Sequence, residues 1–387
     1  MARPSAPLPE SASVVIIGGG VIGCSAAFHL AEAGVDVVLL ERDQLGSGST
    51  SRAAGGIRAQ FSDPLNIQIA QRSLAAFREF SRRPGWEIDL KQVGYLFVLS
   101  HDADVAAFEG HVALQNEYGV PSRMLSAERT RELCPLLAGD DIVAGAFSPD
   151  DGHVTPEAVV QGYAFAARAL GAQLRVGCEA TGVRVAGGEV SEVVTSHGSV
   201  ATGTVICAAG AWSRPCGAMA GVELPVTPLR RQVLFTEPIR ELPAQLPFTI
   251  DFTTSFYFHR EGPGLLMGMS DPDERPGFSL QTTDDWVPRL LEIASRRAPR
   301  IAEAGIKGGW AGLYEVSPDH NAIIGEAPAP SRFIYATGFS GHGFLQGPAV
   351  GEIVRDLVLE RPPFVDIAPL GVERFTEAML RPEFNIV

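Results

Sequence analysis

With 387 residues, of which 45% are hydrophobic and 20% charged, the chain is long enough for two domains and a sizeable buried core. The formal net charge of −14 argues against nucleic acid as a partner, because phosphate binding needs a basic face. Its apolar stretches are strand-length, well short of the roughly 20 residues of a membrane-spanning helix, so we expect no membrane span. Residues 1–10 read as a flexible tail without an export signal, which predicts a cytoplasmic location.

The cysteines lie far apart in the sequence. They form no CxxC pair, and no histidine stands near them at the spacing of a zinc site. We therefore expect reduced, packed thiols, no bound metal and no redox-active cysteine pair. The five residues are Cys24, Cys134, Cys178, Cys207 and Cys216.

The first predicted strand is Val14–Ile17, a β-branched run without alternation that is typical of a parallel strand buried on both faces. The glycine loop Gly18–Gly23 fits GxGxxG and is followed by a predicted helix over Cys24–Ala33, which ends at Gly34. A second strand is predicted over Val35–Leu40. This order of strand, loop, helix and strand is typical of a dinucleotide-binding fold.

Each part of this motif has a physical role. Gly18 permits a tight turn, Gly20 lets a pyrophosphate approach the backbone, and Gly23 allows close packing of helix on strand. The helix N-terminus then faces the phosphates. Glu41, at the end of the second strand, would accept hydrogen bonds from a ribose, and its charge disfavours the 2′-phosphate of NADP. The motif alone does not choose between NAD and FAD.

The residues downstream favour FAD. The small-residue segment Gly46–Arg58 stands where an NAD domain would continue with a strand and a helix. Two further buried strands that end in small residues are predicted far away, over Thr204–Ala211 and Phe333–Gly338. The nucleotide-binding domain is therefore predicted to be discontinuous.

Over nearly its whole length the chain resembles the D-amino-acid oxidase superfamily, and within it the glycine oxidase and sarcosine oxidase branch. Beside the N-terminal motif, the resemblance is carried by Ser49–Arg52 with Gly55–Arg58, by Gly152–Pro156 before a helix, and most specifically by Gly338–Phe344. In the family this last motif precedes a C-terminal helix, here Pro348–Val358, whose N-terminal amides face the flavin.

The resemblance implies an α/β, two-domain fold, in which a Rossmann-like FAD-binding domain of glutathione-reductase type is interleaved with a substrate domain containing a large mixed β-sheet. It implies an FAD-binding domain at 11–85, 150–222 and 316–387, and a substrate domain at 86–149 and 223–315. The cofactor is expected to be non-covalent FAD, with His342 lining the flavin rather than acting as a base. The residues expected to contact FAD are Gly18, Gly20, Val21, Ile22, Gly23, Glu41, Arg42, Ser49, Thr50, Arg52, Ala53, Gly55, Gly56, Ile57, Ala180, Ala209, Gly210, Trp212, Gly338, Ser340, Gly341, His342, Gly343, Phe344 and Leu345.

The resemblance also places a small amino acid or secondary amine at the flavin, held by its carboxylate. Arg58 aligns with the arginine that binds this carboxylate in sarcosine oxidases, and the alternative for it is an exposed ion pair with Asp63. Tyr257 falls near a family tyrosine at the substrate, although a core aromatic fits equally well. Tyr314 and Tyr95 are further candidates.

Three positions depart from the monomeric sarcosine oxidases. Gly312 stands where those enzymes attach the flavin through a cysteine, Leu345 where they place a second carboxylate-binding lysine, and Leu266 where a lysine speeds the reaction with oxygen. The arginine that glycine oxidases carry near Tyr314 is also missing. These departures predict a single carboxylate-binding arginine and a more apolar wall, with Leu266 and Leu345 at a substrate such as an N-alkylglycine larger than sarcosine.

The predicted reaction is the oxidation of the C–N bond of a glycine-type amino acid: glycine, sarcosine or a larger N-alkylglycine. In the family, hydride transfer from Cα to flavin N5 gives an imine, which water hydrolyses to glyoxylate or an aldehyde plus an amine. The alternatives are a D-amino-acid or proline dehydrogenase or oxidase, a β-like flavin subunit of a multi-subunit amine dehydrogenase, and an NAD-dependent dehydrogenase. The sequence leaves open whether O2 or another carrier accepts the electrons, and whether the chain forms a homo-oligomer.

Overall fold

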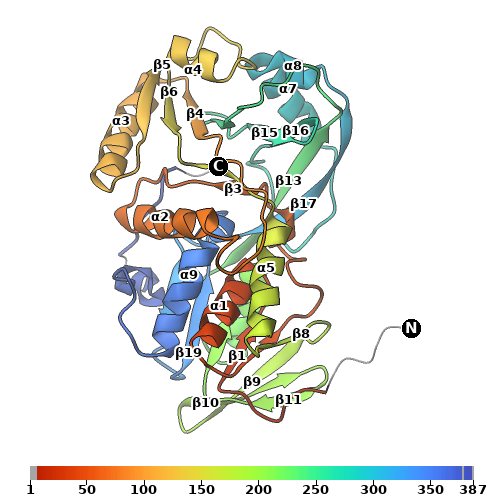
Figure 1. Ribbon diagram of the computed structural model, residues 1–387, viewed down its shortest axis with the longest axis vertical. Coiled ribbons are helices and arrows are strands. Elements are labelled where there is room, and N and C mark those ends of the chain that lie inside the picture. Colours follow the sequence, from red (N-terminus) through yellow and green to blue (C-terminus); the bar gives the residue numbers. More distant parts are fainter. Residues whose placement is uncertain (1–6, 377–378, 386–387) are drawn as a thin grey trace.

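The computed structural model describes residues 7–376 and 379–385 (Figure 1). Most of the predicted tail, residues 1–6, therefore lies outside the described residues, as do 377–378 and 386–387 of the predicted FAD-binding domain. The described chain forms a mixed α/β fold in two parts, each built on its own sheet. In Figure 1 the larger sheet occupies the upper half and the smaller one, with its helices, the lower half.

The first part is built on a six-stranded sheet in the order β18-β19-β12-β1-β2-β8. Its strands are parallel except for β18, which pairs antiparallel with β19. The central strands are short β-branched or aromatic runs that are buried along their whole length, as the sequence predicted for β1. The strands are β1 (Val14–Ile17), β2 (Val37–Leu40), β8 (Gln173–Arg175), β12 (Val205–Cys207), β18 (Ile323–Glu326) and β19 (Phe333–Thr337).

The two faces of this sheet are covered differently. Val14 and Ile16 of β1 pack on the helices, whereas Val15 and Ile17 pack toward a three-stranded antiparallel sheet. The helices on the first face are α1 (Val21–Glu32), α2 (Pro64–Arg78), α5 (Pro156–Ala169) and α9 (Gly343–Val358), and the covering strands are β9 (Ala180–Ala186), β10 (Glu189–Thr195) and β11 (Gly198–Ala201).

Three predicted boundaries are shifted. Helix α1 begins at Val21, before the predicted Cys24, because the amide of Cys24 already donates to the carbonyl of Gly20. Strand β2 begins at Val37 because the amide of Val35 is used to close the turn that ends α1. Helix α9 begins at Gly343 and contains Pro348 in its first turns.

The second part is built on an eight-stranded mixed sheet in the order β17-β13-β16-β15-β14-β4-β6-β5. All its strands come from residues 95–148 and 227–316, which lie within the predicted substrate domain except for Val316, the last residue of β17. Figure 1 shows α3 on one side of this sheet, with α7 and α8 at its far end. The strands are β4 (Tyr95–Leu99), β5 (Arg123–Ser126), β6 (Ala144–Ser148), β13 (Thr227–Thr236), β14 (Phe248–Asp251), β15 (Tyr257–Glu261), β16 (Gly264–Gly268) and β17 (Ile306–Val316), and the helices are α3 (Asp102–Glu117), α4 (Ala127–Leu133), α7 (Val287–Arg297) and α8 (Pro299–Ala302).

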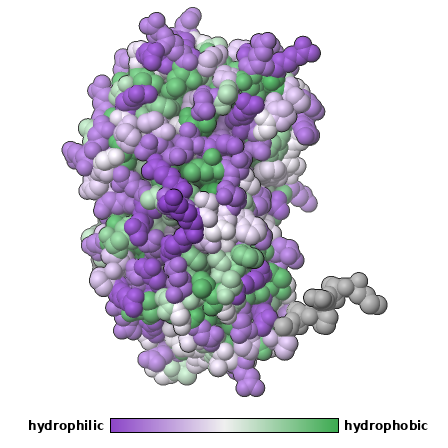
Figure 2. Space-filling view, in the orientation of Figure 1, coloured by the Kyte–Doolittle hydropathy of each residue, from purple (hydrophilic) through white to green (hydrophobic). Residues whose placement is uncertain are grey.

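Short elements join the two parts. The two-residue strands β3 (Gly56–Ile57) and β7 (Gly152–His153) pair where the chain passes from one part to the other, and α6 (Ser213–Ala218) follows β12. Figure 2 shows hydrophilic and hydrophobic residues interspersed on the face seen in Figure 1. All five cysteines are buried and free, which confirms the prediction of packed thiols. Among the described residues no helix has the length and apolarity needed to cross a bilayer.

Candidate active site

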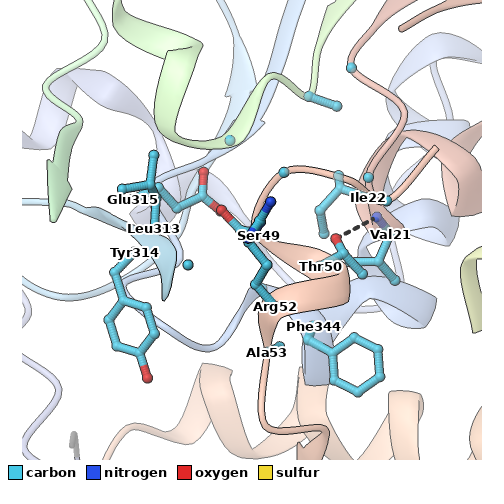
Figure 3. Close-up of a pocket in the computed structure, with 18 of the residues that line it drawn as sticks. Val21, Ile22, Ser49, Thr50, Arg52, Ala53, Leu313, Tyr314, Glu315 and Phe344 are labelled. Carbon is cyan, nitrogen blue, oxygen red and sulfur yellow. Dashed lines mark hydrogen bonds between the residues drawn. The ribbon is translucent and has the colours of Figure 1, made fainter. Parts of the chain in front are cut away.

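A cavity of about 450 Å³ is lined by residues from both parts of the chain. Its walls come from the glycine loop after β1, the segment 46–58, the turn after β12, and strands β13, β15 and β17 of the large sheet. Figure 3 shows Val21 and Thr50 on one side of the opening and Tyr314 on the other, with Arg52 between them. The cavity thus joins the predicted nucleotide site to the predicted substrate site.

The glycine loop has room only for glycine at its tightest points. Gly18 has a φ of +112°, and a Cβ on it would lie 2.3 Å from the carbonyl oxygen of Ala208. A Cβ on Gly23 would lie 1.9 Å from the carbonyl oxygen of Gly18, so α1 packs directly on the loop. The amide of Val21 donates to Oγ1 of Thr50 at 3.1 Å (Figure 3), and the first turn of α1 contains no acidic residue. This helix end therefore suits an anion such as a phosphate.

Glu41 lies at the end of β2 and lines the cavity. Its Oε2 accepts a hydrogen bond from the amide of Gly19 at 2.7 Å, and its Oε1 accepts one from the amide of Asp43 at 2.8 Å. These two bonds fix the carboxylate, which keeps further lone pairs for a ribose hydroxyl.

Arg52 points into the protein and not to the surface. Its Nε donates to the carbonyl of Ser47 at 3.3 Å, and its Nη1 donates to the carbonyl of Ala311 at 3.1 Å. Nε1 of Trp310 donates back to the carbonyl of Arg52 at 3.0 Å. A Cβ on Gly312 would lie 2.8 Å from the Cβ of Arg52, so the backbones of these two segments meet at a glycine.

Arg58 is 2% exposed and lines the cavity next to His342. Its Nη2 lies 3.2 Å from Nε2 of His342 and also donates to the carbonyl of Asn385, while Nη1 donates to the carbonyl of Gln60. Because the guanidinium can only donate, Nε2 of His342 is the acceptor and the imidazole is neutral. Burial, and then the charge of Arg58, hold the pKa of His342 well below its usual range.

The alternative role for Arg58, an exposed ion pair with Asp63, is wrong. Asp63 caps the N-terminus of α2 through Oδ1 and pairs through Oδ2 with Arg381 at 2.6 Å. Arg58 instead faces aromatic rings, with its Cζ 4.3 Å from the centroid of Phe61. It is a buried cation that takes part in no ion pair of the described residues.

Residues 379–385, near the end of the chain, lie against this part of the site. Glu383 is 2% exposed, and its carboxylate accepts hydrogen bonds from the amide (3.0 Å) and the hydroxyl (2.6 Å) of Ser62 and from the amide of Asn385 (2.9 Å). The carbonyl of Asn385 in turn accepts a hydrogen bond from Arg58. This segment therefore helps to position the Arg58 guanidinium.

Aromatic rings from the large sheet form one wall of the cavity. Tyr95 stacks on Phe248 with ring centroids 4.3 Å apart, and Phe248 lies 5.7 Å from Tyr257. Tyr314 of β17 packs against the backbone at Gly341, where a Cβ would lie 2.6 Å from its ring. These four aromatic residues, which include the candidates Tyr257, Tyr314 and Tyr95, all line the cavity and exclude water from it.

Two polar residues at this end were not predicted from the sequence. Arg231 of β13 lines the cavity, and its Cζ lies 5.2 Å from the ring centroid of Tyr314. Glu315 also lines the cavity and accepts hydrogen bonds from the hydroxyl of Thr337 (2.9 Å) and the amide of Gly338 (3.3 Å). Burial raises the pKa of Glu315 to about 7.

A family model described as DAO, FAD dependent oxidoreductase, matches residues 13–357. The chain belongs to this family. It is 32% identical to human sarcosine dehydrogenase and 31% identical to mouse dimethylglycine dehydrogenase, matches that cover 97% and 95% of the chain. The chain spans less than half of the length of these relatives, 43% and 44%.

Solved structures of the same fold are similar over nearly the whole chain. L-Proline dehydrogenase from P. horikoshii has a TM-score of 0.91 and 33% identity, and the match covers 97% of this chain and all of that one. Glycine oxidase from Geobacillus kaustophilus has a TM-score of 0.85 and 27% identity, covering 95% of this chain and 99% of that one. The predicted two-domain α/β fold with a large mixed sheet is thereby confirmed.

FAD is the cofactor of this family, and the cavity fits a dinucleotide. The glycine loop and the open N-terminus of α1 suit the pyrophosphate, and Glu41 stands where a ribose hydroxyl would be bound. At the other end, α9 begins at Gly343 with His342 as its N-cap residue, and both line the cavity. Membership of a family of FAD-dependent oxidoreductases therefore favours FAD over the NAD-dependent alternative.

Most residues predicted to bind FAD or substrate line this one cavity, and four do not. Gly23 packs α1 on the loop, Ile57 is 1% exposed in the core, and Gly338 makes the turn whose amide bonds Glu315. Leu266 is 3% exposed within β16, opposite Phe235, and lies outside the cavity lining. The predicted residues that line the cavity are Gly18, Gly20, Val21, Ile22, Glu41, Arg42, Ser49, Thr50, Arg52, Ala53, Gly55, Gly56, Arg58, Ala180, Ala209, Gly210, Trp212, Tyr257, Tyr314, Ser340, Gly341, His342, Gly343, Phe344 and Leu345.

Proposed function

We propose that this enzyme oxidises the C–N bond of an N-alkylated, glycine-type amino acid, and that Arg58 binds the substrate carboxylate. The observation that carries the proposal is a buried arginine beside an aromatic wall, which has no carboxylate partner among residues 7–376 and 379–385. Its hydrogen bonds to Gln60, His342 and Asn385 use neither Nε nor the second N–H of Nη1. These N–H groups are available to a carboxylate, whose charge would compensate the buried cation.

The names of the relatives support an N-alkylated substrate. Sarcosine and dimethylglycine are N-methylated glycines, and a relative from Paenarthrobacter nicotinovorans, 29% identical over 96% of the chain, is named 4-methylaminobutanoate oxidase. The chain covers only 46% of that relative. The three compounds in these names each contain a carboxylate and an N-methyl amine.

Bound FAD would supply the two-electron oxidation of the C–N bond. The chain would bind the carboxylate through Arg58 and shield the amine from water with Tyr95, Tyr257 and Tyr314. His342 is held neutral beside Arg58, so it adds no second positive charge near the amine. A neutral amine is the form that can be oxidised, because its lone pair is free.

The cofactor is proposed to be held without a covalent bond at Gly312. A side chain there would collide with Arg52, and glycine carries no group that could bond to the flavin. Leu345 lines the cavity, which supports the prediction that it belongs to an apolar wall beside the substrate. The same prediction for Leu266 is wrong, because Leu266 is buried outside the cavity lining.

L-Proline is a second candidate substrate. The match to L-proline dehydrogenase from P. horikoshii covers that whole chain at 33% identity. Proline is a cyclic N-alkyl amino acid with one carboxylate, so the same contact with Arg58 would serve it.

The test is an anaerobic titration of the purified yellow protein with glycine, sarcosine, dimethylglycine, L-proline and a D-amino acid, monitored by the flavin absorbance at about 450 nm. Bleaching by an N-alkylated amino acid supports the proposal, and the best substrate distinguishes the sarcosine type from proline. Rapid return of colour in air identifies an oxidase, and slow return identifies a dehydrogenase. If no amino acid bleaches the flavin, the proposal fails, and a flavin subunit that needs a partner chain becomes the better explanation.

The role of Arg58 is tested with Arg58→Lys and Arg58→Met. Loss of charge-assisted hydrogen bonds to the carboxylate should raise KM about tenfold to a hundredfold in Arg58→Met, with a smaller rise in Arg58→Lys. An unchanged KM in a folded, FAD-containing Arg58→Met would exclude Arg58 as the carboxylate-binding residue.

A further inference from the structure

Besides Arg58, the substrate end of the cavity contains a second arginine, Arg231, without a carboxylate partner. The ion pairs of residues 7–376 and 379–385 include neither arginine. The acidic residues Glu41, Asp43 and Glu179 line the nucleotide end of the cavity. At the substrate end, Arg58 and Arg231 share the lining with one acidic residue, Glu315, so positive charges outnumber negative ones there. Such an excess suits a ligand with more than one negative charge.

In strand β13, the side chain of Arg231 points to the opposite face of the sheet from the side chains of its two neighbours in the sequence. Arg230 faces away from the cavity, where its Nε pairs with Glu274 at 2.8 Å. Gln232, on that same side, contacts Thr283. Arg231 and Val233 point the other way and line the cavity, as alternate residues of a strand do.

The guanidinium of Arg231 is left with unused donors. Nη1 donates to the carbonyl of Arg230 at 3.2 Å, whereas Nε is buried and has no hydrogen-bond partner among the described residues. Nη2 also donates to no described residue, and since Arg231 lines the cavity, its free Nη donors can bind an acceptor there. Glu315 also lines the cavity, but among the described residues it makes no hydrogen bond with Arg231, and its Oε2 accepts from Thr337 and Gly338 instead.

The two arginines lie at different places along the aromatic wall. The Cζ of Arg58 is 6.0 Å from the ring centroid of Tyr95, and that of Arg231 is 5.2 Å from the centroid of Tyr314. Burial raises the pKa of Tyr314, and the charges of Arg231 and Arg58 both oppose this rise. Tyr314 therefore experiences the positive charge of both arginines. A small anionic molecule that binds beside Tyr314 would be attracted by both.

We infer that Arg231 forms a second anion-binding subsite, so that the best substrates are amines with two carboxylates. This inference rests on the proposed function: Arg58 binds the carboxylate next to the reacting carbon, and Arg231 binds a carboxylate on the N-substituent or on the side chain. It replaces the prediction of a single carboxylate-binding arginine. An uncharged group of the same size would leave the free Nη donors of Arg231 unpaired.

Matched pairs of substrates test this inference. N-(2-carboxyethyl)glycine is compared with N-propylglycine, and N-methyl-L-glutamate with N-methyl-L-norvaline. The members of each pair differ only in a terminal carboxylate in place of a methyl group. The dicarboxylate of at least one pair should have a KM about tenfold to a hundredfold lower than its partner, and that pair tells whether the second carboxylate belongs on the nitrogen or on the side chain.

The variant Arg231→Met should remove this preference, so that the KM values of the two members of the pair become equal within about threefold, even if activity toward both changes. Arg231→Gln is measured alongside, so that the result does not depend on how one variant folds. Arg82→Met is the matched control, because Arg82 has an 83% exposed side chain outside the cavity lining. If both Arg231 variants still have a lower KM for the dicarboxylate than for its partner, the inference is overturned. It is also overturned if the variants lose bound FAD but keep this difference in KM.

Inert ligands separate this inference from the proposed function. Glutarate and butyrate cannot be oxidised as amines, but their binding near the flavin would perturb its absorption spectrum. Glutarate should bind at least tenfold more tightly than butyrate to the wild-type enzyme and equally weakly to Arg231→Met. Equal binding of both acids to the wild type overturns the second subsite, even if the enzyme oxidises sarcosine. If no amine is oxidised but glutarate is preferred, the subsite stands and the proposed reaction fails.

Discussion

Replacing Glu383 by alanine tests whether residues 379–385 hold the substrate side of the cavity in place. The carboxylate is 2% exposed and also accepts a hydrogen bond from Nδ2 of Asn66 at 3.0 Å, in addition to those from Ser62 and Asn385. Hydrogen bonds to a charged group contribute about 1.5–3 kcal/mol each, but undocking of the segment would let water reach the freed donors. We therefore expect Glu383→Ala to lose about 2–4 kcal/mol of unfolding free energy, less than the sum of its bonds.

The same substitution should weaken substrate binding at a distance. Once Asn385 is released, Arg58 loses the carbonyl that accepts from its Nη2, so KM should rise severalfold while the amount of bound FAD stays the same. The assay combines guanidinium unfolding with steady-state kinetics. Glu360→Ala is the control, because Glu360 has an 81% exposed side chain. An unfolding free energy within about 0.5 kcal/mol of wild type, together with an unchanged KM, would refute this reasoning.

Three further predictions concern the cofactor and pH. Gly23→Ala should reduce the flavin-to-protein ratio severely, because its Cβ would lie 1.9 Å from the carbonyl of Gly18; Gly110→Ala, which has open space, should keep the wild-type ratio. Heat or acid precipitation should release all the FAD into the supernatant, whereas yellow precipitate would contradict the non-covalent site at Gly312. Burial, and then the charge of His153, lower the pKa of His259 from 6.5 to about 3. Between these two pH values only the unfolded chain binds this proton, so the free energy of unfolding decreases as the pH is lowered below 6.5. In His259→Gln the unfolding free energy should fall less steeply between pH 6 and 4, by up to about 1.4 kcal/mol per pH unit, and equal slopes in denaturant titrations would count against this.

The sequence predicted those parts of the site that depend on local chain geometry. GxGxxG after a buried strand fixes where Gly18 and Gly23 must lie, because only glycine fits these contacts. The small-residue motif at the start of α9 likewise placed His342 and Gly343 in the cavity. The predicted strands at 204–211 and 333–338 contain β12 and β19, which lie side by side in the same sheet as β1.

The sequence analysis did not find Arg231 and wrongly placed Leu266 at the substrate, because the positions of both residues depend on pairing between distant strands. The sequence comparison looked for an arginine near Tyr314 in the same segment, but β13 pairs with β17 and brings Arg231 over Tyr314 from elsewhere in the chain. The adjacent pair Arg230 and Arg231 is a signal that could have been used, because adjacent residues of a strand such as β13 face opposite sides. For Leu266, the resemblance predicted a position at the substrate, but Leu266 pairs with Phe235 between β16 and β13 and lies outside the cavity lining.

The order of strands in the six-stranded sheet has a consequence for how the chain folds during synthesis. Strand β1 is paired on one side by β12 and β12 by β19, so the middle of this sheet is assembled from the start, the centre and the end of the chain. A ribosome must translate residue 337 before the last of these strands is available, and α9 follows later still. Until then the outer edge of β12 has no partner strand and its backbone N–H and C=O groups stay unpaired, which makes the nascent chain a natural client for chaperones that bind exposed strands.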